Sequence, residues 1–451
     1  MKYANIEIGT REVAVYSASG KDARLTQRLE ARGRMDEVYN RGVFSIDSDR
    51  IFSTALEGLR AAGEVDRVTV TCQPDAVVIL DEDDRLLFPV LARRDPGLDQ
   101  VDLTSVDTRG AYMKSGALIS TTGALSRILA SRSEDAHLFR RAATYMFLGD
   151  YLRYQLTGVK ATDRTLAQAA GLAAYSTGAW LDEVFSAAEL ENLFPAFAQE
   201  DSVLGSFTGE VEKEVGYSAQ VVMIPSLPLA LAPRVLDLEL AVTSYLDGKI
   251  VLGNSSAEVD GSAWDDGVMN IRAGEGCLVC LPFAGYDLID RVRRQSAEGT
   301  TYDTIENLAR ENKVFEYVDI RDGRLSSGDV VDAVNSILDE NGKEKAEREV
   351  AIGVLYNSIA RYTVGSMMIL DRIGGRHGGA VYILGQASKD YYLNSLIAMH
   401  TGKTVISSSG FFASSFANLY SMIMAGEAGR NDVLDMIRKS YGVATFSRRD
   451  E

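Results

Sequence analysis

Residues 5–16, N-I-E-I-G-T-R-E-V-A-V-Y, are the stretch on which the fold assignment depends. Apolar and polar residues alternate on both sides of Gly9-Thr10, which predicts two strands joined by a tight glycine turn. The apolar positions of these strands are Ile6, Ile8, Val13 and Val15. Such a turn offers backbone N–H groups and one carboxylate, that of Glu7, to a phosphate and a metal. An ordinary N-terminal hairpin is the alternative interpretation, and only partners elsewhere in the chain could favour the phosphate site.

Length, charge and composition narrow the class of protein. A chain of 451 residues predicts two or three domains. The net charge of −17 argues against nucleic acid and anionic membranes as partners, because both are themselves negatively charged. The N-terminal residues lack a basic-then-apolar leader pattern, and the apolar runs are shorter than a membrane span needs. We therefore expect a cytoplasmic protein.

The cysteines and histidines do not form a recognisable metal or redox motif. Cys72, Cys277 and Cys280 are too few for a disulfide framework in a chain of this length. Cys277 and Cys280 have a C-x-x-C spacing, but no second cysteine pair exists and the three histidines are scattered. Plain buried thiols are the favoured interpretation.

The N-terminal half alternates strands and helices. The apolar run 68–72 predicts a buried strand, and residues 76–80 and 86–90 predict a hairpin around the acidic turn 81–84. Residues 167–204 are expected to be rich in helix, and 31–40 to be extended. The other expected elements are helices at 50–62, 123–131 and 144–156, the last closed by Gly158, and a strand at 221–224.

The C-terminal half begins with an echo of the first hairpin. Residues 249–261, K-I-V-L-G-N-S-S-A-E-V-D-G, again suggest a strand, a turn of small residues and a return, which indicates internal duplication. We therefore expect two domains, 1–245 and 246–451. The expected elements that follow are helices at 327–338, 345–373, 391–401 and 413–424, and strands at 380–384 and 404–406.

Four blocks of sequence resemble the FGGY carbohydrate kinases, and among them the rhamnulokinases. Residues 77–95 carry an L-D-E-D-D-R-L hairpin followed by R-D, and residues 145–180 carry L-T-G and then T-G-A-W. Residues 314–329 contain Y-V-D and S-G-D, and residues 382–426 contain L-N-S-L-I-A-M-H-T-G-K-T-V and end in A-G-E. Their order and spacing cover nearly the whole chain, so the resemblance is consistent at several levels.

The resemblance implies an α/β fold of two actin-like, ribonuclease H-like domains that flank a central cleft. The sugar side of the cleft would be domain 1–245 and the nucleotide side domain 246–451. The family's chemistry is transfer of a phosphoryl group from ATP to a sugar hydroxyl with Mg²⁺. That reaction needs a metal, backbone donors around the phosphates and a carboxylate that accepts the hydroxyl proton.

Two motifs on the N-terminal side depart from the family pattern. The resemblance places the phosphate and metal turn at Glu7, Gly9 and Thr10, with Glu7 as the magnesium ligand in place of the family's aspartate, and Glu12 adds negative charge beside the turn. The family's His-Asp pair, whose aspartate is the base, falls on Leu227 and Pro228. No Asp or Glu lies between residues 214 and 237, and the weak substitutes elsewhere are Asp75, Glu258 and Asp260.

The nucleotide loops are altered as well. The second phosphate turn falls on Asn254-Ser255-Ser256, where the family writes Ser-Gly-Thr. The adenine loop, glycine-rich in the family, is Gly385-Gln386-Ala387-Ser388, and the Gln386 side chain would take space that a glycine leaves to the nucleotide. The resemblance thus implies nucleotide contacts at Gly385, Gln386 and Ser388 and phosphate contacts at Ser255 and Ser256.

Two functions remain open. The first is a sugar kinase of a rhamnulose-like or related sugar that uses ATP and Mg²⁺ with a relocated base. The second is a pseudokinase without cofactor, which senses a sugar or sugar phosphate or serves as a scaffold for a protein partner or a second copy of itself. Gln73, Asp75 and Leu227 are the expected sugar-facing residues in either case.

Overall fold

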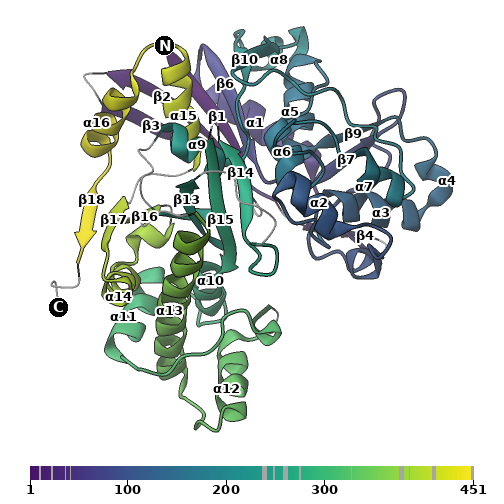
Figure 1. The fold of residues 1–451 in the computed structure, drawn as a ribbon. Coiled ribbons are helices and arrows are strands. Elements are labelled where there is room, and N and C mark those ends of the chain that lie inside the picture. Colours follow the sequence, from purple (N-terminus) through teal and green to yellow (C-terminus); the bar gives the residue numbers. More distant parts are fainter. Residues whose placement is uncertain are drawn as a thin grey trace.

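The computed structural model describes residues 1–451 except 10, 11, 22, 23, 36, 41, 236–240, 247, 248, 257–262, 274, 275, 327, 375–379, 385, 409–412 and 448–451. Within these residues two large mixed sheets carry the fold, and Figure 1 shows the purple strands of the first sheet above the green strands of the second. Two small sheets and sixteen α-helices complete the described part.

Both large sheets follow one plan. In the first, β1, β2 and β3 are antiparallel neighbours, and β6 and β11 follow in parallel with β1. In the second, β12, β13 and β15 repeat the antiparallel set, and β16 and β17 repeat the parallel pair. This repetition confirms the duplication that the sequence indicated, and it is the two-domain actin-like α/β fold that the resemblance implied.

The strand order also defines the edges of the sheets. The first sheet runs β10 (Ser202–Ser206), β11 (Gln220–Met223), β6 (Arg67–Cys72), β1 (Lys2–Ile8), β2 (Glu12–Lys21) and β3 (Arg24–Arg34). The second runs β14 (Met269–Ala273), β15 (Gly276–Ala284), β13 (Lys249–Ser256), β12 (Ala241–Leu246), β16 (Ala380–Leu384), β17 (Thr404–Ser408) and β18 (Val443–Phe446). The small sheets pair β4 (Glu37–Asn40), β5 (Val43–Ile46) and β8 (Val90–Leu91), and β7 (Val77–Leu80) with β9 (Thr144–Phe147).

The helices cover the faces of these sheets, and among the described residues none is long and apolar enough to cross a membrane. Those of the first half are α1 (Ser48–Ala62), α2 (Thr108–Ser115), α3 (Ala124–Glu134), α4 (Ala136–Phe139), α5 (Leu148–Thr157), α6 (Arg164–Ala169), α7 (Asp182–Ala187), α8 (Gly209–Val215) and α9 (Pro228–Val235). Those of the second half are α10 (Tyr286–Arg294), α11 (Tyr302–Glu311), α12 (Val330–Glu340), α13 (Arg348–Gly374), α14 (Tyr391–Thr401), α15 (Ala413–Met424) and α16 (Arg430–Ser440).

The opening hairpin has two different faces. Ile6 and Ile8 point to the core that α1 covers, as their alternation predicted. The opposite face carries Asn5, whose side-chain amide donates to the Thr69 hydroxyl at 3.0 Å and accepts from the Thr71 hydroxyl at 3.1 Å. The polar residue Asn5 of the alternating pattern is therefore buried rather than exposed to solvent. Its burial is tolerated because its side chain is hydrogen-bonded.

A helix from the end of the chain covers that polar face. Residues of α15 and α9 form one hydrophobic cluster with Tyr3, Ala18 and Leu25 of the first sheet. The same cluster includes Ile271 and Leu278 of the second sheet, so it joins the two sheets. Figure 1 shows α15 and α16, in yellow, beside the purple strands β1 to β3.

Four local expectations are wrong. Residues 167–204 are not rich in helix, because only the end of α6 and α7 are helical there. Thr144–Phe147 is the buried strand β9 and the helix begins only at Leu148, because a short apolar run does not distinguish strand from helix by periodicity. The arm expected at 86–90 makes one bridge, Leu80 to Leu86, and β8 pairs with β5 instead. The turn expected at 254–256 is wrong because β13 continues to Ser256.

Helix α1 approaches β2 at a glycine. A Cβ atom built on Gly58 would lie 2.4 Å from the Cβ of Val15, far inside van der Waals contact. Val15 is β-branched and fully buried, so it has little freedom to move aside. The close packing of helix on sheet at this point thus requires a residue without a side chain.

We predict that Gly58→Ala lowers the free energy of unfolding by about 1–2 kcal/mol. Alanine favours a helix over glycine by about 1 kcal/mol, but overpacking a rigid core costs about 1–3 kcal/mol or more. Urea denaturation measures the change, with Glu57→Ala at the exposed neighbouring position as the matched control. A stabilised Gly58→Ala variant would contradict the packing described here.

Candidate functional site

The carboxyl ends of β1, β6 and β11 meet at one edge of the first sheet, where parallel α/β sheets usually place their sites. Gly9, Gln73 and Asp75, all expected at the site from the sequence, line one cavity there. Arg93 and Arg127, which the sequence did not indicate, line it too. The cavity measures about 60 Å³. That is the space of about two water molecules, and ligand pockets are usually about 300–1,000 Å³.

Glu7, the expected magnesium ligand, is engaged elsewhere. Its carboxylate accepts a hydrogen bond of 3.2 Å from the backbone N–H of Ser414 in the first turn of α15. Negative charge is favourable at that end of a helix. Thr10 lies outside the described residues, and the described part of the chain contains no group of three or more His, Cys, Asp or Glu side chains suited to a metal. Glu7 could thus supply one carboxylate ligand, and a magnesium ion here would take its other ligands from phosphate and water.

The turn between β11 and α9 occupies the position expected for the base. Pro228 is the first residue of α9, a position where proline is favoured because its missing N–H has no helical partner. Leu227 and Pro228 are both buried, and Leu227 is 4% exposed within the cluster that joins the two sheets. The expected sugar-facing residue Leu227 thus lies in a hydrophobic core.

A buried charge network fixes this turn. The Arg153 guanidinium donates to Asp150 at 2.7 Å and to the Val70 carbonyl of β6 at 2.8 Å, and it also donates to the Ser226 hydroxyl. Both charged side chains are 1% exposed. Asp163 completes the network, because its carboxylate accepts from Ser226 N at 2.6 Å while its own N–H donates to Asp150.

The network shifts the pKa of one member. Burial raises the pKa of Asp150, and the neighbouring Arg153 guanidinium offsets part of that rise. None of these residues was predicted from the sequence to be functional. The available signal was the Asp150 and Arg153 pair, three residues apart on the buried side of a helix, where unpaired charges do not occur.

The nucleotide side presents acidic groups. Gln386 lines a cavity of about 170 Å³ with the carboxylates of Asp303, Glu306 and Asp390. Ser388 is fully buried, and its hydroxyl donates to the carbonyl of Ser408 at 2.9 Å. Lys389 lines the same cavity and Glu306 forms an ion pair with Arg310, so cations offset part of the negative charge of its carboxylates.

The other residues expected at the nucleotide and catalytic sites lie outside the described residues or at one end of β13. Gly385 and Asp260 lie outside the described residues. Ser255 and Ser256 are paired with Leu278 and Cys277 in the second sheet, at the far end of β13 from its hairpin with β12. Their nucleotide contacts stay a prediction. By topology, the counterpart of the Gly9 turn is at 247–248, which also lies outside the described residues.

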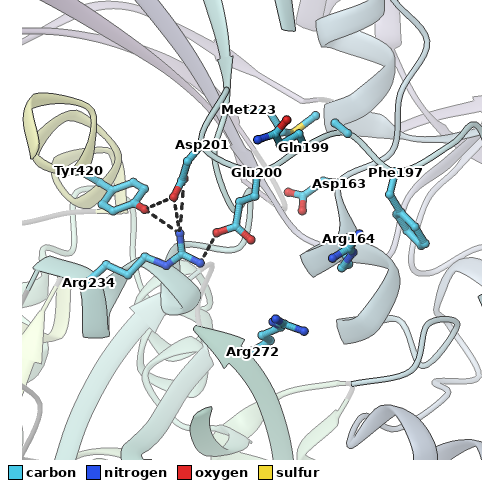
Figure 2. Close-up of a pocket in the computed structure, with 11 residues that line it drawn as sticks. Asp163, Arg164, Phe197, Gln199, Glu200, Asp201, Met223, Arg234, Arg272 and Tyr420 are labelled. Carbon is cyan, nitrogen blue, oxygen red and sulfur yellow. Dashed lines mark hydrogen bonds and ion pairs between the residues drawn. The ribbon is translucent and has the colours of Figure 1, made fainter. Parts of the chain in front are cut away.

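A larger cavity, of about 620 Å³, is lined by residues from both the N-terminal and the C-terminal half of the chain and is drawn in Figure 2. Residues 197–201, which precede β10, form one part of its lining. The other parts come from α6, α9, β14 and α15 through Asp163, Arg164, Arg234, Arg272 and Tyr420. None of these residues was predicted from the sequence to be functional, since the strands and helices that carry them are far apart along the chain.

We predict that Arg153→Met lowers the free energy of unfolding by about 3–5 kcal/mol, because it leaves the Asp150 carboxylate buried without its cation. Denaturation with guanidinium chloride measures the loss. The double variant Asp150→Leu with Arg153→Met removes both charges, and it should be less destabilised than Arg153→Met alone. A single variant as stable as the wild type would contradict the network.

Asp390 predicts a pH dependence of stability. Burial, helped by the charge of Glu306, raises the pKa of Asp390 to about 7, although Tyr356 O–H and Leu393 N–H donate to it. Between pH 3.8, the ordinary pKa of the group, and about pH 7, the folded state therefore keeps a proton that the unfolded state has released. Stability contributed by this group is present below the lower value and lost as pH rises towards the upper one.

Thermal melts at several pH values between about 4 and about 8 measure this effect. Asp390→Asn should flatten the decline of Tm with rising pH. Asp303→Asn, which changes an exposed carboxylate of the same cavity, should keep the wild-type slope. Parallel pH profiles for Asp390→Asn and the wild type would contradict the assignment.

Known proteins resemble this chain in sequence and in fold. Residues 56–227 match the N-terminal domain of the FGGY family of carbohydrate kinases. A rhamnulokinase from Oceanobacillus iheyensis is 23% identical over 98% of this chain and 97% of its own. The fold is similar to that of a xylulose kinase from Rhodospirillum rubrum, with a TM-score of 0.75 and 15% identity over 100% of this chain and 95% of the other.

A glycerol kinase from Plasmodium falciparum, solved with ADP, has a similar fold, with a TM-score of 0.75 and 12% identity over 99% of this chain and 94% of the other. The structural similarities extend across both sheets, while the matched N-terminal domain covers the strands and helices around the buried network. The chain is thus similar in sequence to FGGY carbohydrate kinases, with a family match over residues 56–227, and similar in fold to solved sugar kinases over nearly its whole length.

Proposed function

We propose that this FGGY homologue recognises a sugar or sugar phosphate and has weak or no kinase activity towards a rhamnulose-like sugar. The proposal depends chiefly on the turn at 224–228. Pro228 occupies the position expected for the base, and both Leu227 and Pro228 are buried, Leu227 within the apolar cluster that joins the two sheets. A side chain without a proton acceptor cannot assist attack by a sugar hydroxyl.

Two further features support weak catalysis. Glu7 is bonded to the start of α15, and the cavity beside Gln386 is acidic. Each feature alone could be compensated, but metal, nucleotide and base together supply most of the stabilisation in phosphoryl transfer. As a sensor or scaffold, the protein would act through a protein partner or a second copy of itself.

A slow kinase with a relocated base is the second candidate. Asp75 favours it, because this half-buried carboxylate lines the same cavity as Gly9 at the carboxyl end of β6. The enzyme would then use ATP and Mg²⁺, and the cavity would have to widen when a sugar binds.

We predict little or no sugar-dependent release of ADP when the protein is mixed with ATP, Mg²⁺ and rhamnulose, xylulose or gluconate. Loss of a general base typically costs about 10²–10⁴ in rate, so activity should be at most about 1% of that of an active relative. The rhamnulokinase from Oceanobacillus iheyensis serves as the positive control. Turnover comparable to this control would overturn the proposal.

Restoring the motifs provides the complementary test. We expect Pro228→Asp combined with Gln386→Gly to increase ADP release or nucleotide binding, because it returns a proton acceptor and opens the nucleotide loop. Pro228→Ala combined with Gln386→Gly is the matched control without a carboxylate. If Asp75→Asn abolished a measurable wild-type activity, the relocated-base enzyme would replace the present proposal.

A further inference from the structure

The cavity of about 620 Å³ shown in Figure 2 has the size of a small-molecule site. Its lining residues come from both halves of the chain and do not include Gly9, Gln73, Asp75, Leu227 or Gln386. Its chemistry is therefore separate from the kinase site considered above, and an occupant would contact both units at once.

On one side of the cavity the charged side chains pair with one another. Arg234 is 9% exposed and forms ion pairs with Glu200 and Asp201, while Tyr420 donates to Asp201 at 2.6 Å and accepts from Arg234 at 2.8 Å. Burial raises the pKa of Glu200, and the charge of Arg234 opposes that rise. These groups form a fixed polar wall whose charges are directed at one another.

The carboxylate of Asp163 is also engaged. Its two oxygens accept backbone N–H groups, from Thr165 at 2.7 Å and from Ser226 at 2.6 Å, and it serves as the N-cap of α6. Its charge is thereby stabilised by backbone dipoles. All three acids of the lining thus have hydrogen-bond partners within the protein.

The other side presents two cations without carboxylate partners. In the described part of the chain neither Arg164 nor Arg272 forms an ion pair. The Arg164 guanidinium lies over the Phe197 ring at 5.3 Å, and Arg272 donates to the Tyr175 carbonyl at 3.3 Å. Figure 2 shows both side chains apart from the joined group of Glu200, Asp201, Arg234 and Tyr420.

The remaining donors complete the site. Each guanidinium carries five N–H groups, so Arg164 and Arg272 keep several available for a ligand. The Nε of Arg234 is buried and has no hydrogen-bond partner among the described residues. The lining holds three arginines and three acids, so it is locally balanced in a chain of net charge −17, and Arg164 and Arg272 are its cations without carboxylate partners among the described residues.

We propose that this cavity binds a small hydroxylated organic anion, a sugar phosphate or a sugar acid, with Arg164 and Arg272 contacting its charged group. Guanidinium groups bind phosphate and carboxylate through paired hydrogen bonds. The wall of Glu200, Asp201 and Tyr420 supplies acceptors for hydroxyl groups. This site does not depend on whether the protein transfers a phosphoryl group.

Calorimetric titration of the full chain at low ionic strength, without ATP or Mg²⁺, tests the proposal. The probes are glucose 6-phosphate, gluconate, neutral glucose and inorganic phosphate. We expect one or both organic anions to bind more tightly than glucose and than inorganic phosphate. Stronger binding of glucose 6-phosphate would identify the phosphate ester as the ligand class, and stronger binding of gluconate the carboxylate.

Variants locate the binding. Arg272→Gln should weaken binding of the preferred anion by about tenfold or more, the cost of losing a hydrogen bond to a charged group. Arg164→Gln, at an exposed position that the fold does not need, should weaken it as well. Arg140→Gln makes the same change of net charge at an exposed position outside the cavity lining and should leave the affinity unchanged.

Three outcomes would overturn the proposal. These are no binding of either organic anion, equal binding of inorganic phosphate, and equal loss of affinity in Arg140→Gln. ADP release plays no part in this measurement, so a negative result leaves the proposed loss of kinase activity untouched.

Discussion

The buried ion pair of Arg153 and Asp150 is the interaction on which the centre of the molecule depends. It connects helix α5 to the carbonyl of Val70 in β6 and to Ser226 in the turn before α9. The Ser226 carbonyl in turn accepts a hydrogen bond of 3.0 Å from the Cys72 N–H, so the turn is held against the end of β6. A single charged side chain thus fixes the entry of α9, and α9 is the helix that leads from the first sheet towards the second.

The packing of α9 extends this constraint to the rest of the fold. Ala230 and Leu231 of this helix are fully buried in the cluster that also contains Phe416 and Leu419 of α15. Helix α15 covers the polar face of β1, where Glu7 meets Ser414. Glu7, which the sequence resemblance assigns to a phosphate and metal turn, here connects β1 to the start of α15.

Much of this fold is predictable from local sequence. The alternation around Gly9 predicts the hairpin, and the apolar run at 68–72 predicts β6, because both patterns reflect the period of a strand. The buried network and the large cavity are not predictable in this way. Arg234, Glu200 and Tyr420 are distant in sequence and meet only through the packing of α9 and α15. Residues 144–147 show a second limit, since a run of four buried residues suits either a strand or a helix.

The covering of the first sheet by α15 has a consequence for synthesis of the protein. Strands β1 to β3 are translated long before the helix that buries one of their faces, which ends at Met424. Until then Tyr3, Ala18 and Leu25 lack their final apolar partners. At about 5–20 residues per second, the nascent chain would carry an uncovered sheet face for tens of seconds, and such surfaces favour aggregation. A molecule built in this order has a reason to need chaperone protection on the ribosome, whatever its ligand.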